Sequence, residues 1–358
     1  MKKRLLAFLC CPSCGGSLRH DEFSSDRRTR ETIDGMLVCS RCRKWYPIIA
    51  GIPRMLPFNM IRKDMLSAYM EKYSSHIPKG LREEAPEAAR LKAKTSKSFG
   101  FQWNAFSEIF PEFEQNFLDY ISPLDRPFFR GKLVLDAGCG FGRHTYFAAK
   151  YGAEVIGFDL SDAVEAAYRN CAGLRKVHIV QGDIYKPPFR KRFDFIMSIG
   201  VLHHLPDPEK GFLRLAELSR SGKPVFAWVY GREGRWFKVY VVEGVIRQLT
   251  KRTPHRALYY MCYIPASVYQ LSNALYRFCE KRPALRPLGR FFPFKGYAKF
   301  PFRVKHADAF DLLATPVNNY YRREDMEKWA KDARLADVRI TQLGGKSWRL
   351  FGRKRHRG

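Results

Sequence analysis

The middle of this 358-residue chain contains short apolar runs that each end in a polar or glycine-rich stretch. Segments rich in helix-forming residues separate the runs. The runs are Val134-Leu135, Glu154–Phe158, Lys176–Val180 and Phe193–Ile199. Strands that alternate with helices are typical of an open α/β fold with a parallel sheet. Because such sheets bind ligands at the carboxyl ends of their strands, we expect the functional site there.

A glycine-rich turn follows the first predicted strand. Asp136 ends the strand, and Gly138, Gly140 and Gly142 follow at alternate positions. Small residues let a backbone approach a ligand, and a helix that starts near Arg143 would direct its free N–H groups toward it. The spacing differs from the dinucleotide fingerprint G-x-G-x-x-G. A carboxylate at the strand end would repel a pyrophosphate, but it suits a ligand with an ammonium or sulfonium group.

The later strand ends carry polar residues as well. Asp159 closes the second strand, 21 residues after Gly138, which is about the separation at which an acid binds ribose hydroxyls. Asp183 follows the third strand, and Gly200 follows the fourth. The alternative is a simple tight turn with acids that cap helices, but four strand ends agree on a binding site.

Together these segments resemble the successive motifs of class I S-adenosylmethionine-dependent methyltransferases. The resemblance covers roughly residues 97–231 and resumes near 318–352. It implies a doubly wound, Rossmann-like sheet of seven strands, with S-adenosylmethionine as the methyl donor. The residues that it assigns to the donor are Asp136, Gly138, Gly140 and Gly142 for the methionine part, Asp159 and Leu160 for the ribose, Asp183 and Ile184 for the adenine, and Gly200 beside them.

The remaining core elements are expected toward the C-terminus. Pro224–Tyr230 is predicted as the fifth strand. A helix over Arg323–Ala333 precedes two antiparallel closing strands, Val338–Leu343 and Lys346–Gly352, which a glycine pair joins. Between the fifth strand and this helix lies a long insertion, in which Val239–Leu249 and Ala257–Phe278 are predicted helices.

The stretch before the core is charged and rich in good helix formers over Arg62–Lys72 and Glu83–Lys94. It leads into an aromatic segment that contains Phe101 and Trp103. These two rings either close over the donor or pack the connector onto the core.

Two C-x-x-C pairs lie near the N-terminus. Cys11 and Cys14 form the first pair, and Cys39 and Cys42 follow after a gap of 24 residues. Two such pairs complete a tetrahedron of thiolates around one zinc ion, and a site filled by four protein ligands is structural. Disulfides need an oxidising compartment and a redox site uses one pair, so both alternatives are disfavoured. Cys10 has the wrong spacing to Cys14, and we expect it to take no part.

The flanking residues resemble a small zinc-ribbon family that activates several RNA and protein methyltransferases as a separate subunit. The segments that carry the resemblance are Cys11–Leu18, Gly35–Cys39, Trp45–Ile48 and Gly51–Pro57. It implies a ribbon fused to the methyltransferase core in one chain. Zinc would then supply folding energy to a piece with little core of its own.

These patterns divide the chain into five segments. We expect a zinc ribbon over 1–58, a helical connector over 59–98, the first part of the core over 99–231, a basic aromatic insertion over 232–306 that acts as an acceptor lid, and the end of the core over 307–358.

The net charge of +29 bears on the identity of the methyl acceptor and on where in the cell the protein is expected. The insertion has 16 Lys and Arg against 3 Asp and Glu, interleaved with aromatic residues. Such a surface suits RNA, and it equally suits an anionic bilayer or a lipid-linked acceptor. A protein acceptor, a non-catalytic homologue and a generally basic proteome are further alternatives. No apolar run reaches the length of a membrane span. We expect a cytoplasmic protein that reaches the inner membrane surface if the insertion binds lipid.

The segment after the fourth strand favours a small acceptor. It reads Leu-His-His-Leu over 202–205, without the signatures of exocyclic-amine or cytosine-C5 methyltransferases. This form resembles enzymes that methylate small molecules, quinones, sugars and lipid intermediates. We therefore expect transfer to an oxygen or nitrogen of a small-molecule, glycan or lipid-type acceptor, with RNA methylation as the alternative.

Methyl transfer from a sulfonium requires an oriented acceptor and a base for an O–H or N–H proton. His203 and His204 follow the fourth strand, close to where the methyl group is expected, and histidine titrates near neutrality. Either ring could instead pack or orient the loop. Tyr320 is a further candidate, because it falls in a segment that forms a lid in many relatives.

Overall fold

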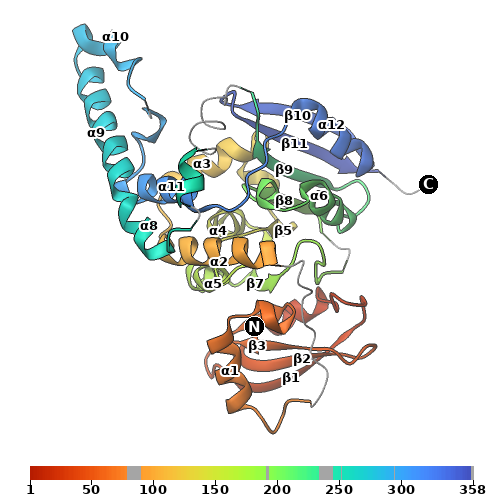
Figure 1. The fold of residues 1–358 in the computed structure, drawn as a ribbon. Helices are drawn as coiled ribbons and strands as arrows, with labels where there is room; N and C mark the ends of the chain where they lie inside the picture. The colour runs from red at the N-terminus through yellow and green to blue at the C-terminus, as the bar shows by residue number, and fades with distance from the viewer. Residues whose placement is uncertain (79–89, 191–192, 234–244, 251, 294, 356–358) are drawn as a thin grey trace.

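The computed structural model describes residues 1–78, 90–190, 193–233, 245–250, 252–293 and 295–355. Its described strands form one sheet of eleven, in the order β1-β2-β3-β4-β7-β6-β5-β8-β9-β11-β10. Figure 1 shows the N-terminal ribbon at one end of this sheet and a helical arm that projects from the body.

The seven strands from β7 to β10 form the methyltransferase-type core. Five of them are parallel: β7 (Val177–Gly182), β6 (Glu154–Asp159), β5 (Leu133–Ala137), β8 (Phe195–Ile199) and β9 (Pro224–Tyr230). The closing strands β11 (Ser347–Lys354) and β10 (Leu335–Leu343) pair antiparallel with β9 and with each other. The predicted doubly wound sheet of seven strands is therefore confirmed.

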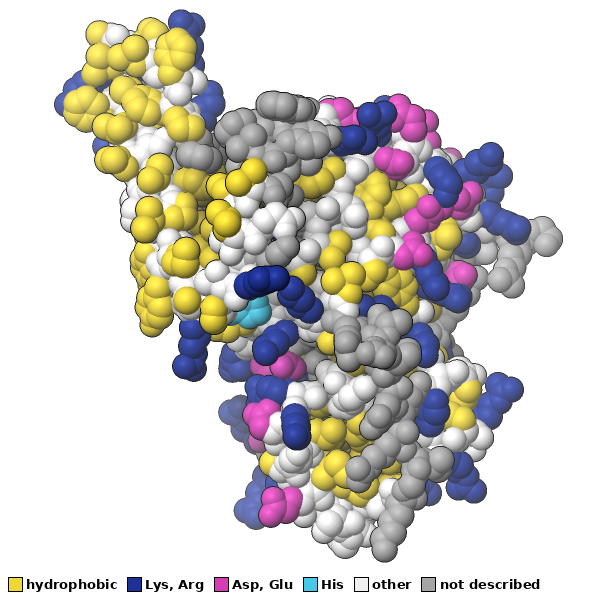
Figure 2. Space-filling view, in the orientation of Figure 1, with side chains coloured by type: hydrophobic (Ala, Val, Ile, Leu, Met, Phe, Trp, Pro, Cys, Tyr) yellow, Lys and Arg dark blue, Asp and Glu magenta, His cyan; other side chains and the backbone are white. Residues whose placement is uncertain are grey.

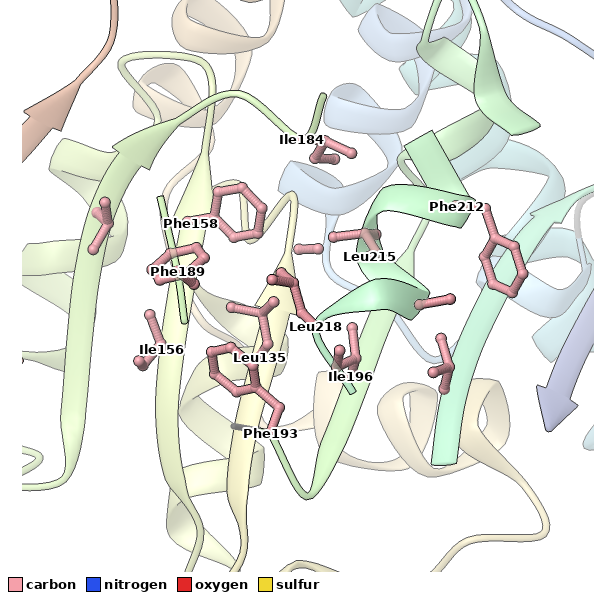
Figure 3. Packing of buried hydrophobic residues seen from close by; sticks show 14 of the residues in the cluster. Leu135, Ile156, Phe158, Ile184, Phe189, Phe193, Ile196, Phe212, Leu215 and Leu218 are labelled. Atoms are coloured by element: carbon pink, nitrogen blue, oxygen red, sulfur yellow. The ribbon is translucent and has the colours of Figure 1, made fainter. Parts of the chain in front are cut away.

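Helices cover both faces of this core. The helices concerned are α3 (Glu112–Ile121), α4 (Arg143–Lys150), α5 (Val164–Cys171), α6 (Pro208–Glu217) and α12 (Arg323–Asp332). Side chains alternate along β5, so Val134 packs in the cluster of α3 and α4 while Leu135 packs in the cluster of α6 and α12. Figure 3 shows Leu135 and Ile196 of the strands facing Leu215 of α6.

The zinc ribbon is a small antiparallel sheet that continues into the core. It contains β1 (Leu18–Ser25), β2 (Thr32–Cys39), β3 (Trp45–Ile49) and β4 (Ile52–Met55). Strand β4 pairs in parallel with β7, where Arg54 lies opposite Gln181 and Met55 opposite Gly182. We expected the ribbon as a segment of its own. The shared sheet was not predicted, because it depends on pairing between residues more than a hundred positions apart.

Two helices lie between the ribbon and the core. α1 (Lys63–Lys72) matches its predicted range within one residue. Residues 79–89, where the second helix was expected to begin, lie outside the described residues. α2 (Arg90–Ala105) continues through the expected segment boundary at residue 98 and reaches the aromatic segment. The helix formers of the connector and the aromatic residues therefore belong to one element.

The insertion is helical where it is described. Its elements are α7 (Arg247–Thr250), α8 (His255–Met261), α9 (Tyr263–Glu280), α10 (Arg286–Gly289) and α11 (Phe302–Ala314). The single helix predicted over Ala257–Phe278 is divided at Cys262, and most of the helix predicted at Val239–Leu249 lies outside the described residues. α11 crosses the expected boundary at residue 306. Short 3-10 turns lie at Lys3–Ala7, Phe58–Met60, Arg126–Phe129, Leu202–His204, Pro283–Leu285 and Lys295–Tyr297.

None of the helices in the described part of the chain has both the length and the apolar character needed to cross a membrane.

Candidate functional site

A cavity of about 330 Å³ lies at the carboxyl ends of β5, β6, β7 and β8. Eight of the predicted site residues line it: Gly138, Gly140, Asp159, Leu160, Asp183, Ile184, Gly200 and His204. The strand ends therefore meet at one site, as expected for an open α/β sheet. Asp136, Gly142, His203 and Tyr320 do not line the cavity.

The turn after β5 can be made only by glycines. Gly138 has a φ of +82°, and a Cβ atom there would lie 2.3 Å from a methyl carbon of Val201. Gly142 has a φ of +85° and immediately precedes α4. A side chain at either position would be strained or would clash. The turn therefore brings bare backbone to the edge of the cavity at Gly138 and Gly140.

Asp136 lies near the end of β5, just before this turn. Its carboxylate accepts a hydrogen bond of 2.6 Å from the Thr145 hydroxyl of α4. Complete burial raises the pKa of Asp136 to about 7. We expected Asp136 to contact the methionine part of the donor. Asp136 does not line the cavity, and its side chain points toward α4, so this contact with the donor stays a prediction.

Asp159 and Asp183 present carboxylates to the cavity. Asp159 accepts hydrogen bonds from the backbone of Gly140 at 3.0 Å and from the hydroxyl of Ser161 at 2.7 Å, while burial raises its pKa. Asp183 accepts from the backbone of Tyr185 at 2.9 Å. Carboxylate oxygens held in this way suit the hydroxyl and amino donors of a nucleoside and would disfavour a phosphate.

Lys92 of α2 was not predicted as a site residue. Its ammonium lies 2.8 Å from the carboxylate of Asp183 and 4.2 Å from the ring centre of Tyr185. All three residues line the cavity. The sequence offered no signal for this contact, because 91 residues separate Lys92 from Asp183.

The aromatic residues of α2 divide between the two roles considered from the sequence. Trp103 lines the cavity, where its ring lies 5.0 Å from that of Phe141. Phe101 packs against His255 and Phe310, outside the lining. Trp103 thus lies at the cavity beside Gly140, and Phe101 attaches the connector to the insertion.

The two adjacent histidines have different environments. His204 lines the cavity, and its Nδ1 lies 2.9 Å from the carbonyl oxygen of Val317. The side chain of Asn318 adjoins the same nitrogen. Burial lowers the pKa of His204. His203 is fully buried, and its ring stacks on Tyr230 at 3.9 Å.

Tyr320 also lies behind Tyr230 and not in the cavity. Its ring is 5.8 Å from that of Tyr230, which itself lines the cavity at the end of β9. Further lining residues that we did not predict are Tyr120, Trp228, Tyr297, Asp308, Asp311 and Asn318. They are aromatic, acidic or amide side chains, and they come from α3, β9, the turn at Lys295–Tyr297, α11 and the segment after α11.

The four cysteine sulfur atoms of Cys11, Cys14, Cys39 and Cys42 all lie within 4.8 Å of one another. The Cys11–Cys42 and Cys14–Cys39 sulfur distances are 3.6 and 3.5 Å. A zinc ion bound at about 2.3 Å requires sulfur separations of about 3.8 Å in a tetrahedron, so the cluster fits zinc. Cys10 is outside this group, and its backbone donates to Pro188.

Two protein families match the chain. A model described as a methyltransferase domain matches residues 135–226, and a model described as Trm112p-like protein matches residues 2–51. The chain therefore contains a segment that belongs to the methyltransferase-domain family and, before it, a Trm112p-like segment. The match to the methyltransferase-domain model ends before the insertion, so it does not identify the methyl acceptor.

Curated proteins similar to this chain include ubiquinone biosynthesis O-methyltransferases. The protein from Coxiella burnetii is 33% identical over 115 residues, which are 31% of this chain and 48% of the relative. That from Hahella chejuensis is 30% identical over 162 residues, 42% of this chain and 66% of the relative. The chain thus spans about half the length of the first of these relatives.

Among solved structures, the chain is similar to human N-acetylserotonin methyltransferase in complex with S-adenosylmethionine. The TM-score is 0.41 with 13% identity, and the alignment covers 80% of this chain and 62% of the human protein. This level of similarity carries no argument about the substrate.

Proposed function

We propose that this chain transfers a methyl group from S-adenosylmethionine to an oxygen or nitrogen of a small-molecule, glycan or lipid-type acceptor. The observation that carries the proposal is one cavity that joins Gly138, Asp159 and Asp183 to the imidazole of His204. The names of the curated relatives support an oxygen acceptor of quinone type. A phenolic hydroxyl on a quinone precursor is therefore the first acceptor to test.

The donor half of the cavity fits S-adenosylmethionine. Gly138 and Gly140 leave room for a ligand against the backbone, Asp159 would accept from ribose hydroxyls, and Asp183 would accept from the adenine amino group. Lys92 now occupies one side of Asp183, so nucleoside binding would share or displace this ion pair. Bound S-adenosylmethionine supplies an electrophilic methyl group on a sulfonium that leaves as a neutral thioether.

His204 is the proposed base. Nε2 would take the proton of the acceptor O–H or N–H as the acceptor atom bonds to the methyl carbon and the carbon–sulfur bond breaks. In this role Nδ1 would carry the other proton and donate it to the Val317 carbonyl 2.9 Å away, which would orient the ring and stabilise the imidazolium that forms. Because burial lowers the pKa of His204, the ring is neutral and able to accept a proton near pH 7.

Tyr120, Trp228 and Tyr230 line the cavity, and we assign them to the acceptor half. Flat aromatic walls position a planar ring by stacking and exclude water from it. Asp308 and Asp311 of α11 add hydrogen-bond acceptors to the same half of the cavity. We propose that these residues select an acceptor with an aromatic or quinone-like ring that carries hydroxyl groups.

Calorimetry with S-adenosylhomocysteine tests the donor site. Wild type should bind, and Asp159→Ala should bind at least about tenfold more weakly, because two ribose hydrogen bonds to a charged group are lost. Asp64→Ala, which removes a surface acid paired with Arg62, is the matched control and should bind as wild type does. If wild type binds no S-adenosylhomocysteine, the proposed activity is wrong.

Labelled S-adenosylmethionine tests the acceptor. Purified enzyme should label the small-metabolite or lipid fraction of a cell extract. The relatives give no support to RNA methylation, and label found only in the RNA fraction would replace the proposed acceptor with RNA. Contact between the insertion and a membrane surface is also a proposal. It rests on the described helices of the insertion.

A further inference from the structure

The helix α9 carries its large apolar side chains on the outside of the molecule. Five of them repeat at alternating intervals of four and three residues: Ile264, Val268, Leu271, Leu275 and Phe278. All five are exposed, with Ile264 at 73% and Leu271 at 63%. This spacing places them on one stripe along the helix, which we call the outer face of α9.

The opposite side of α9 packs against the protein with small or polar residues. The buried residues of this helix are Ala266, Ser272, Asn273 and Cys279. The Ser272 hydroxyl donates to the carbonyl of Pro293, and Lys305 of α11 donates to Gln270 at 2.9 Å. A surface helix of a globular protein normally buries its apolar stripe. α9 has the reverse arrangement, so its outer face is suited to an apolar partner.

The apolar surface extends beyond α9. Tyr260 and Met261 at the end of α8 are exposed, as are Leu288 in α10 and Phe291 just after it. Figure 2 shows apolar side chains gathered over the projecting arm, with basic side chains at its margins. Contiguous exposed apolar patches of this kind mark interaction sites.

Basic residues flank this apolar surface. Residues 245–300 contain 11 Lys and Arg and a single acid, Glu280. Arg277, Lys281, Arg282, Arg286 and Arg290 are all exposed. The guanidinium of Arg282 lies 3.6 Å from the ring centre of Phe278, so its stem follows the apolar surface while its charge remains at the edge.

We propose that the outer face of α9 docks on the surface of an anionic lipid bilayer. The apolar side chains would enter the boundary between headgroups and acyl chains, and the flanking arginines and lysines would contact the lipid phosphates. α9 is about 27 Å long at 1.5 Å per residue, and it would lie in the plane of the membrane rather than across it. This proposal is independent of the proposed methyl transfer.

Charge complementarity favours a bilayer over a second copy of this chain. Two outer faces in contact would bring two rims of the same positive charge together, which costs energy unless anions intervene. An anionic bilayer provides both the apolar layer and the opposite charge. RNA would match the charge but would leave the apolar stripe exposed to water.

Co-sedimentation with lipid vesicles tests the proposal. Wild type should bind vesicles of phosphatidylcholine with 30% phosphatidylglycerol and should bind pure phosphatidylcholine much less. Ile264→Gln with Leu271→Gln should reduce the partition coefficient by on the order of tenfold for each replaced side chain. Arg282→Gln with Arg286→Gln should reduce binding by about tenfold and weaken its dependence on salt.

The control variant is Val338→Gln, which replaces an exposed apolar residue on β10, away from the insertion. It should bind vesicles as wild type does. The side chains of Ile264 and Leu271 are exposed, so their variants should fold, and unchanged S-adenosylhomocysteine binding would verify this. The proposal is overturned if the wild type does not bind anionic vesicles. It is also overturned if the variant with Ile264→Gln and Leu271→Gln binds them as well as the wild type does. Sedimentation that shows a dimer abolished by the same variant, without vesicle binding, would assign the face to a second copy instead.

Discussion

At the scale of single residues, His203 and His204 show how neighbouring positions with the same side chain acquire different roles. Both follow β8 in a short 3-10 turn, and both are buried. The turn directs His204 into the cavity and His203 against Tyr230. Sequence predicted the pair near the site but could not tell which ring would line the cavity, since this depends on the Tyr230 ring contributed by β9.

The pH dependence of the reaction should report His204. Burial lowers its pKa below the usual 6.5, so the neutral base is present above the lowered value and is lost as the pH falls through it. We expect kcat to decline on the acid side with a midpoint below 6.5. His204→Ala should lower kcat by about 10²- to 10⁴-fold and remove this acid limb.

S-adenosylhomocysteine affinity of the His204→Ala variant serves as the control, and it should stay within a few-fold of wild type. An acid limb that persists in this variant would show that another group acts as the base.

At the scale of elements, the junction between β4 and β7 connects the Trm112p-like domain to the wall of the cavity. The side chain of Arg54 is fully buried there, 2.5 Å from the carboxylate of Glu165 and 3.2 Å from the side chain of Gln181. Gln181 in turn donates to the carbonyl of Leu160, which lines the cavity. The ribbon thus supports the loop proposed to hold the ribose.

Loss of the Arg54 side chain should destabilise the whole chain. Arg54→Met leaves the partly buried carboxylate of Glu165 without its cation, and breaking such a pair costs about 3 kcal/mol. We expect a decrease of this size in the free energy of unfolding, measured in urea, and weaker S-adenosylhomocysteine binding. Arg62→Met breaks an exposed pair with Asp64 and should change stability very little. Equal effects of the two substitutions would contradict the role assigned to Arg54.

Local patterns predicted the elements better than they predicted the site. The strands from β5 to β9 and the glycine turn are encoded in short stretches, and their polar ends meet because parallel strands share an edge. Lys92 and Arg54 act through partners about a hundred residues away, so no local pattern reveals them. Asp136 has the residue type expected of a ligand contact, and only the structure reveals that its carboxylate accepts a hydrogen bond from Thr145 of α4.

At the scale of the whole molecule, zinc should support the fold through the ribbon. We expect about one zinc ion per chain by elemental analysis, bound by the four-cysteine cluster. Cys11→Ser with Cys14→Ser should abolish zinc binding and lower the melting temperature, because the ribbon has little core without the metal.

Cys10→Ser is the matched control for the zinc prediction, since Cys10 adjoins Cys11 but lies outside the cluster. It should keep its zinc. A metal-free chain that melts at the wild-type temperature would refute a structural role for the ion.

The continuous sheet that joins β4 to β7 bears on the solubility of the core by itself. Without residues 1–58, β7 would become an edge strand with unpaired backbone groups, in a core whose strands are otherwise covered on both faces. Open parallel edges of this kind recruit strands from other molecules. The isolated methyltransferase domain is therefore expected to aggregate, and the Trm112p-like domain would serve as its permanent, covalently attached solubility partner.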